Sequence, residues 1–189
     1  EYMNEFDRQG MLVMAETRHF ATAPEYLEQL KTLVLRDRNR PSVIMWSIGN
    51  EEHYFITEQG RKMAEKMTQI VKSLDGTRPV MTANDKKPEV SKVYDASDIV
   101  GINYNLDIYE AVRENYPNKC FVASECAATS STRGWYLDDC LEKAYLSAYD
   151  KDTNNWFLGR EKTHQKLASL PFVAGWYQWI GIEHRGEAY

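Results

Sequence analysis

Short runs of consecutive apolar residues alternate along the chain with longer stretches in which apolar side chains recur every three or four positions. The runs predict strands at 11–15, 43–48, 79–83, 98–103, 120–124 and 172–179. Each run lacks the polar alternation of a strand that faces water on one side. We therefore expect strands that are buried on both faces, as in a parallel sheet covered by helices.

The stretches between the runs predict helices. The two clearest helices extend from Pro24 to Val34 and from Ile56 to Leu74. Shorter helices are expected at 89–94, 108–115 and 156–170, with an irregular stretch at 127–155. Strands that alternate with helices are typical of βαβ units.

The turn after the first predicted strand helps to choose between α/β architectures. A dinucleotide-binding sheet usually places a glycine-rich turn there, whereas this chain has Glu16-Thr17-Arg18. The pattern therefore favours a (β/α) barrel. A complete eight-stranded barrel takes about 250 residues, so six runs in 189 residues predict an incomplete barrel that lacks two βα units.

Composition and charge exclude several classes of protein. The chain has 23 Lys and Arg against 28 Asp and Glu, a net charge of −5, which argues against a nucleic-acid partner. No apolar run approaches the roughly 20 residues of a membrane span. Three cysteines and four dispersed histidines predict neither a disulfide framework nor a structural zinc site. We expect no cofactor, no metal and no membrane partner, while homo-oligomer formation stays open.

Two predicted strands end in a glutamate, Glu51 and Glu125. A carboxylate directly after a buried strand is costly unless it has partners or a function. In a closed barrel, strand ends that are three steps apart lie nearly opposite each other across the mouth, where barrel enzymes carry their chemistry. Glycoside cleavage needs such a pair, one carboxyl to protonate the leaving oxygen and one to attack or to activate water. Two loop charges on the surface are the alternative.

Four segments carry a family resemblance. Residues 39–51 (NRPSVIMWSIGNE) closely resemble the acid/base signature of glycoside hydrolase family 2, which contains β-galactosidases, β-glucuronidases and β-mannosidases. Residues 7–16, 122–125 and 176–187 are similar to other segments of its catalytic barrel, in the same order. The resemblance implies a (β/α)8 TIM barrel with strands three to eight present. Residues 1–189 would then be one partial catalytic domain with no second domain.

The resemblance also implies a role for each glutamate. Glu51 would be the acid/base and has to be protonated when the leaving group departs, whereas Glu125 would be the nucleophile and has to be ionised. Tyr104 would donate its hydroxyl to Glu125, with simple packing as the alternative.

Further residues at the strand ends are candidates for substrate binding. Asn50 offers both a donor and an acceptor for a sugar 2-OH, unless it only forms a turn. Trp179 offers a flat apolar face for the sugar ring, while strand alternation places Trp176 on the opposite side, in the expected core. Glu16 is expected to bind a substrate hydroxyl, with a structural ion pair as the alternative.

Two features of the sequence bear on the substrate. Residues 126–131 resemble a β-galactosidase-like subgroup, and no Asn-x-Lys motif of the kind that glucuronidases use follows the last predicted strand. The resemblance implies a retaining glycosidase that cleaves terminal β-linked sugars, with β-D-galactosides first. The alternatives are another family 2 β-glycosidase (a β-glucuronidase or β-mannosidase), a catalytically inactive fragment, and a metal-dependent hydrolase at 51–53. Three adjacent residues at a strand end cannot all face one ion, which disfavours the last.

Overall fold

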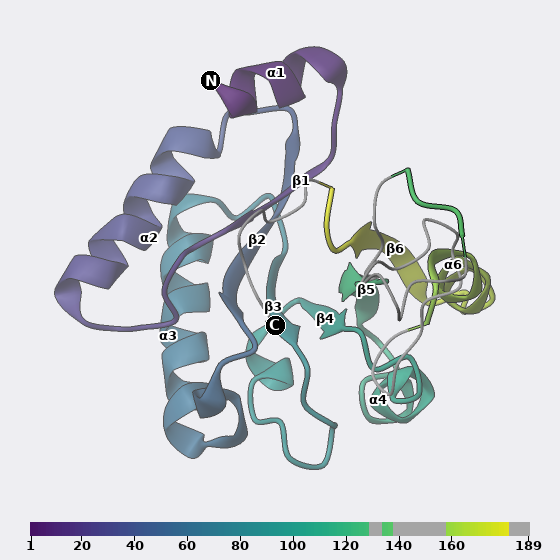
Figure 1. Ribbon diagram of the computed structural model, residues 1–189. Coiled ribbons are helices and arrows are strands. Elements are labelled where there is room, and N and C mark those ends of the chain that lie inside the picture. Colours follow the sequence, from purple (N-terminus) through teal and green to yellow (C-terminus); the bar gives the residue numbers. More distant parts are fainter. Residues whose placement is uncertain (129–133, 138–157, 182–189) are drawn as a thin grey trace.

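The computed structural model describes residues 1–128, 134–137 and 158–181. A six-stranded parallel sheet forms the centre, and its strands lie in the order of the sequence (Figure 1). The strands are β1 (Val13–Glu16), β2 (Val43–Asn50), β3 (Val80–Asn84), β4 (Ile99–Asn103), β5 (Cys120–Cys126) and β6 (Val173–Gln178). The predicted strands are confirmed. Most of the stretch at 127–155 and residues 182–187 of the last family-like segment lie outside the described residues.

Helices connect the strands. They are α1 (Tyr2–Gln9), α2 (Pro24–Asp37), α3 (Glu58–Leu74), α4 (Tyr109–Asn115) and α6 (Arg160–Ala168), with short 3-10 helices η1 (His53–Ile56) and η2 (Tyr94–Ala96). The helix predicted at 89–94 is wrong, because the backbone N–H of Lys92 donates to the carbonyl of Phe55 at 2.7 Å instead of to a helical neighbour. The sequence did not predict α1, which buries no side chain.

Two groups of helices cover the outer side of the sheet. Helices α2 and α3 pack against β1, β2 and β3, whereas α4 and α6 pack against β4, β5 and β6 (Figure 1). Buried side chains such as Val34 of α2 and Val71 of α3 each stabilise the fold by about 1.5–3 kcal/mol. A smaller apolar cluster of β2, β3 and β5 residues packs against Tyr177 of β6.

The two outer strands mark the flanks of the sheet. Within the described residues β1 pairs only with β2, and β6 only with β5. Leu12, just before β1, is 66% exposed. Six paired strands with two open flanks match the expected incomplete barrel. In the part of the chain that the structure describes, no helix is both long and apolar enough to cross a membrane.

All strands are parallel, so their C-terminal ends lie along one edge of the sheet. At this edge Gly49 of β2 allows the ring of Phe20 to approach closely. A Cβ at position 49 would lie 2.8 Å from that ring, closer than two carbon atoms can pack. Phe20 is buried and contacts the ring of Phe55 edge-on. This packing holds the Phe20 ring against the end of β2.

Candidate active site

The ends of β2 and β4 continue into strained turns. Backbone hydrogen bonds extend past both strands: Glu51 N–H donates to Ala83 O at 2.9 Å, and Tyr104 N–H donates to Glu125 O at 2.8 Å. Glu51 and Tyr104 both have positive φ angles, 52° and 51°. A left-handed conformation costs a non-glycine residue about 1–2 kcal/mol. Such strain concentrates at functional sites, so these turns single out this edge of the sheet.

A buried amide joins the ends of three strands. The side chain of Asn103, at the end of β4, is 0% exposed. Its Nδ2 donates to Oδ1 of Asn50 at 2.8 Å and to Oε1 of Glu51 at 2.9 Å. Its Oδ1 accepts from Ser124 Oγ of β5 at 2.6 Å. Asn103 thus connects the predicted acid/base on β2 with the strand that carries Glu125.

Glu125 has one hydroxyl donor and two acidic neighbours. The hydroxyl of Tyr104 donates to Oε2 of Glu125 at 2.8 Å, which is the contact expected of Tyr104. Burial raises the pKa of Glu125; Tyr104 and Asn103 oppose this rise, and the charges of Glu51 and Glu16 add to it. Burial and the bond to Glu125 also raise the pKa of Tyr104. The tyrosine therefore stays a donor over the ordinary pH range.

Glu16, at the end of β1, is a second buried carboxyl on this edge. Ser47 Oγ of β2 donates to its Oε2 at 2.6 Å. Burial raises the pKa of Glu16, Ser47 and Arg18 lower it, and the charge of Glu52 raises it. No described cation forms an ion pair with Glu16. The structural ion pair considered for this residue is therefore absent from the described residues.

Trp176 lies in β6 and Trp179 directly after it, and only the burial expected of Trp176 differs from the structure. Trp179 follows β6 at the same edge as the glutamates; its N–H donates to Cys126 O at 2.9 Å, its peptide bond to Ile180 is cis, and it is 40% exposed. The expectation that Trp176 lies in the core is wrong, since it is 38% exposed. It contacts the ring of His164 on α6 edge-on at 5.0 Å. Strand alternation fixes the face of Trp176, but the described residues cover this face only in part.

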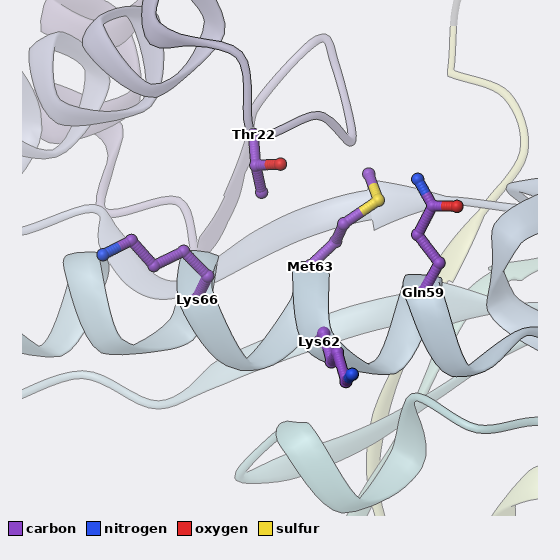
Figure 2. A pocket seen from close by; sticks show the side chains of 5 residues that line it. All are labelled: Thr22, Gln59, Lys62, Met63 and Lys66. Carbon is purple, nitrogen blue, oxygen red and sulfur yellow. The ribbon is translucent and has the colours of Figure 1, made fainter.

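The described part of the surface has two hollows. One, of about 440 Å³, lies between Thr22 and the α3 side chains Gln59, Lys62, Met63 and Lys66 (Figure 2). The other, of about 470 Å³, lies between α6 and the ends of β5 and β6. Neither is lined by Glu51 or Glu125. Within the described residues, no group of three or more His, Cys, Asp or Glu side chains is placed to hold a metal ion.

Sequence reasoning missed Asn103 and Ser124. Asn103 ends an apolar run, where an asparagine is easily interpreted as the start of a turn, and Ser124 resembles a small strand residue. A signal was present: β2, β3 and β4 all end in asparagine, at Asn50, Asn84 and Asn103. A repeated amide at buried strand ends needs partners, and two of these asparagines are partners of each other.

Several known proteins are similar to this chain. The β-galactosidase BoGH2A of Bacteroides ovatus is 26% identical over 99% of this chain and 29% of its own length. The β-glucuronidase of Sus scrofa is 30% identical over 49% of this chain and 14% of its own length. A solved glycosyl hydrolase family 2 member from Bacteroides cellulosilyticus superposes with a TM-score of 0.69 at 29% identity, covering 94% of this chain and 21% of that one.

The chain thus spans less than a third of the length of these relatives. The family model for "Glycosyl hydrolases family 2, TIM barrel domain" matches residues 1–151. The match includes β1 to β5 and therefore Glu51, Asn103 and Glu125. The chain belongs to glycosyl hydrolase family 2, and its six strands form part of the TIM barrel domain of that family.

Proposed function

We propose that this chain carries both catalytic carboxyls of a retaining β-glycosidase, with Glu51 as acid/base and Glu125 as nucleophile. One observation carries the proposal: Glu51 and Glu125 flank the same Asn103–Tyr104 strand end and interact electrostatically in a member of a glycosidase family. Retaining enzymes place the two carboxyls about 5–5.5 Å apart, and inverting enzymes about 6.5–9.5 Å. We expect the shorter separation here.

The reaction would proceed by double displacement. In the first step the Glu51 proton moves to the glycosidic oxygen, the bond from C1 to that oxygen breaks, and a Glu125 oxygen bonds to C1. In the second step Glu51 takes a proton from water, the water oxygen bonds to C1, and Glu125 leaves as carboxylate. Tyr104 is a fixed donor to Glu125, so it stabilises the negative charge that the nucleophile carries before attack and after release.

The remaining strand-end residues would bind the sugar. Trp179 is partly exposed beside β5 and supplies an aromatic face for the ring. Asn50 lies beside the acid/base and is suited to the 2-OH. Glu16 has one oxygen bonded to Ser47, which leaves the other for a substrate hydroxyl. No cofactor is needed for this chemistry.

A terminal β-D-galactoside is the substrate we propose first. Two relatives that are each 26% identical cover nearly all of this chain, a β-galactosidase over 99% and a putative β-glucuronidase of Formosa agariphila over 96%. We place the galactoside first because residues 126–131 resemble a β-galactosidase-like subgroup. A β-glucuronidase or β-mannosidase with the same carboxyl pair is the second candidate. We also propose that residues 1–189 are strands three to eight of a longer polypeptide, given the short span of its relatives that they cover.

Hydrolysis of matched aryl glycosides tests the proposal. The complete polypeptide that contains these residues is assayed with 4-nitrophenyl β-D-galactoside, β-D-glucuronide and β-D-mannoside, and the configuration of the first product is followed by NMR. We expect cleavage of the galactoside with a β-configured first product. An α-configured product contradicts retention, and cleavage of the glucuronide or mannoside alone contradicts the sugar assignment. The isolated 189-residue chain, assayed in parallel, tests the inactive-fragment alternative.

A further inference from the structure

Asn103 lies between the two glutamates, and the mechanism proposed above gives it no role. Its two N–H groups donate to Asn50 and Glu51 and its Oδ1 accepts from Ser124, so every side-chain hydrogen-bonding group is engaged. A hydrogen bond from the same amide also lowers the pKa of Glu125. A buried amide with every group paired is held in one orientation. We propose that Asn103, anchored by Ser124, is a positioning residue that directs the transferable proton of Glu51 to Oε2 and turns the Nδ2 of Asn50 to the sugar. The inference rests on the proposed function.

The orientation of the Asn103 amide follows from the charge of its neighbour. In the second half of the reaction Glu51 has to be ionised to accept a proton from water, and an ionised carboxylate only accepts hydrogen bonds. The Asn103 atom that faces Glu51 is therefore the nitrogen, in agreement with the contact at 2.9 Å. Oδ1 then faces Ser124, whose hydroxyl donates to it at 2.6 Å.

This orientation distinguishes the two oxygens of Glu51. Oε1 accepts an N–H from Asn103, so a proton on Oε1 would face that N–H and displace it. When Glu51 is protonated, Oε1 is therefore the carbonyl oxygen, and the hydrogen resides on Oε2. No described residue donates to Oε2. The same oxygen gives its proton to the glycosidic oxygen in the first step and takes one from water in the second, while the bond from Asn103 persists throughout.

The second N–H of Asn103 determines the orientation of the Asn50 side-chain amide. Oδ1 of Asn50 is the acceptor of this bond at 2.8 Å. Within the described residues its Nδ2 makes no hydrogen bond. Asn50 therefore presents a donor, and it binds the oxygen of a sugar hydroxyl. A single buried side chain thus orients both the acid and the group beside it.

The dependence on the leaving group separates a positioning role from a structural one. A good leaving group such as 2,4-dinitrophenolate needs little protonation, whereas an alkoxide needs a well-placed acid. In the complete enzyme, kcat/KM is measured for 2,4-dinitrophenyl and methyl β-D-galactoside. We expect Asn103→Ala to lower the ratio of methyl to dinitrophenyl kcat/KM by about 100-fold, the size of effect that a misplaced catalytic group produces.

Two further variants control this experiment. Ser124→Ala removes only the anchor of the Asn103 amide, and we expect the same ratio to fall by about tenfold. Asn84→Ala is the matched structural control, because Asn84 is equally buried at the end of the neighbouring strand but bonds to Ser91 and Lys86 instead of a glutamate. We expect it to leave the ratio unchanged even if it lowers Tm. If Asn103→Ala does not fold, the ratio measured for Ser124→Ala tests the positioning role.

The outcomes of the two proposals are distinguishable. An active wild type whose ratio is unchanged by Asn103→Ala and Ser124→Ala overturns the positioning role but leaves the glycosidase assignment intact. A ratio that falls equally in Asn84→Ala shows a general effect of burial and also overturns the positioning role. A wild type that cleaves neither galactoside nor any other aryl β-glycoside overturns the proposed function, and the inference with it.

Discussion

Both ends of the sheet carry carboxyl groups, but their electrostatic surroundings are opposite. At the N-terminal end Asp75 accepts hydrogen bonds from Trp46, Thr77 and Arg78, and these bonds hold its pKa below the usual range against the effect of burial. At the C-terminal end Glu125 has no cation partner among the described residues, and burial raises its pKa.

The contrast extends to other carboxyls at each end. Asp37 forms ion pairs with Arg36 and Arg40, next to the start of β2, whereas burial raises the pKa of Glu16 at the end of β1. A buried carboxyl with a cation stabilises the fold, and one without a cation is costly to keep charged. The presence of a cation partner therefore distinguishes the carboxyls of the N-terminal end from those of the C-terminal end. In barrels the C-terminal end is also the catalytic end.

Replacement of Glu125 should have the largest effect on rate. In the complete enzyme, Glu125→Gln removes the nucleophile, so no glycosyl-enzyme forms and kcat falls by about 10⁴-fold or more. The same change should not lower Tm, because it removes a carboxyl that the fold leaves without a cation. A variant with a lower Tm but retained activity would contradict a catalytic role for Glu125 and indicate a structural one.

Replacement of Glu51 should have an effect that depends on the leaving group. Glu51→Gln should lower kcat/KM by about 10²–10⁴-fold for alkyl galactosides and far less for 2,4-dinitrophenyl galactoside, whose departure needs little acid. Azide, which needs no general base, should accelerate turnover of the activated substrate and give a β-galactosyl azide. Equal losses of rate for both leaving groups would contradict the acid/base assignment of Glu51.

Removal of the charge at the opposite end should affect stability instead. Asp75→Asn leaves Arg78 without its buried partner, and we expect the free energy of unfolding to fall by about 3 kcal/mol. Urea titration measures the change. The activity of the folded enzyme should be unchanged, since no glutamate of the C-terminal edge contacts Asp75. A stable but inactive variant would contradict the separation of roles.

The smallest predicted effect is an opposite dependence of stability on pH. The folded-state pKa of Asp75 is lowered, so its stabilising contribution is lost as the pH falls below the ordinary value of 3.8. The folded-state pKa of Glu125 is raised, so its contribution is greatest below 4.5 and is lost as the pH rises through the folded-state pKa. The Tm difference between wild type and each variant, Asp75→Asn or Glu125→Gln, should therefore change with pH in opposite directions. If both Tm differences changed with pH in the same direction, the opposite pKa shifts of Asp75 and Glu125 would be contradicted.

The sequence predicted the sheet better than the site. The six strands are confirmed because uninterrupted apolar runs leave few other buried conformations. Helix α1 was missed because it has only eight residues and most of them are polar, so no apolar stripe extends over more than two turns. The contact between Tyr104 and Glu125 was expected from a family resemblance, but the bonds of Asn103 were not. These bonds connect Asn103 to side chains that lie 52 and 53 positions earlier in the sequence. Only the pairing of β2 with β3 and of β3 with β4 brings these side chains together.

Covalent trapping of the glycosyl-enzyme identifies the nucleophile. A 2-deoxy-2-fluoro-β-D-galactosyl donor with a 2,4-dinitrophenyl leaving group forms the glycosyl-enzyme but slows its hydrolysis, because the 2-fluorine destabilises the oxocarbenium-like transition state. Mass spectrometry of the digested complete enzyme then locates the sugar. We expect a fluorogalactosyl ester on Glu125, with Glu51 unmodified. An ester on Glu51 or on another carboxyl, or no ester in an enzyme that cleaves galactosides with inversion, would contradict this expectation.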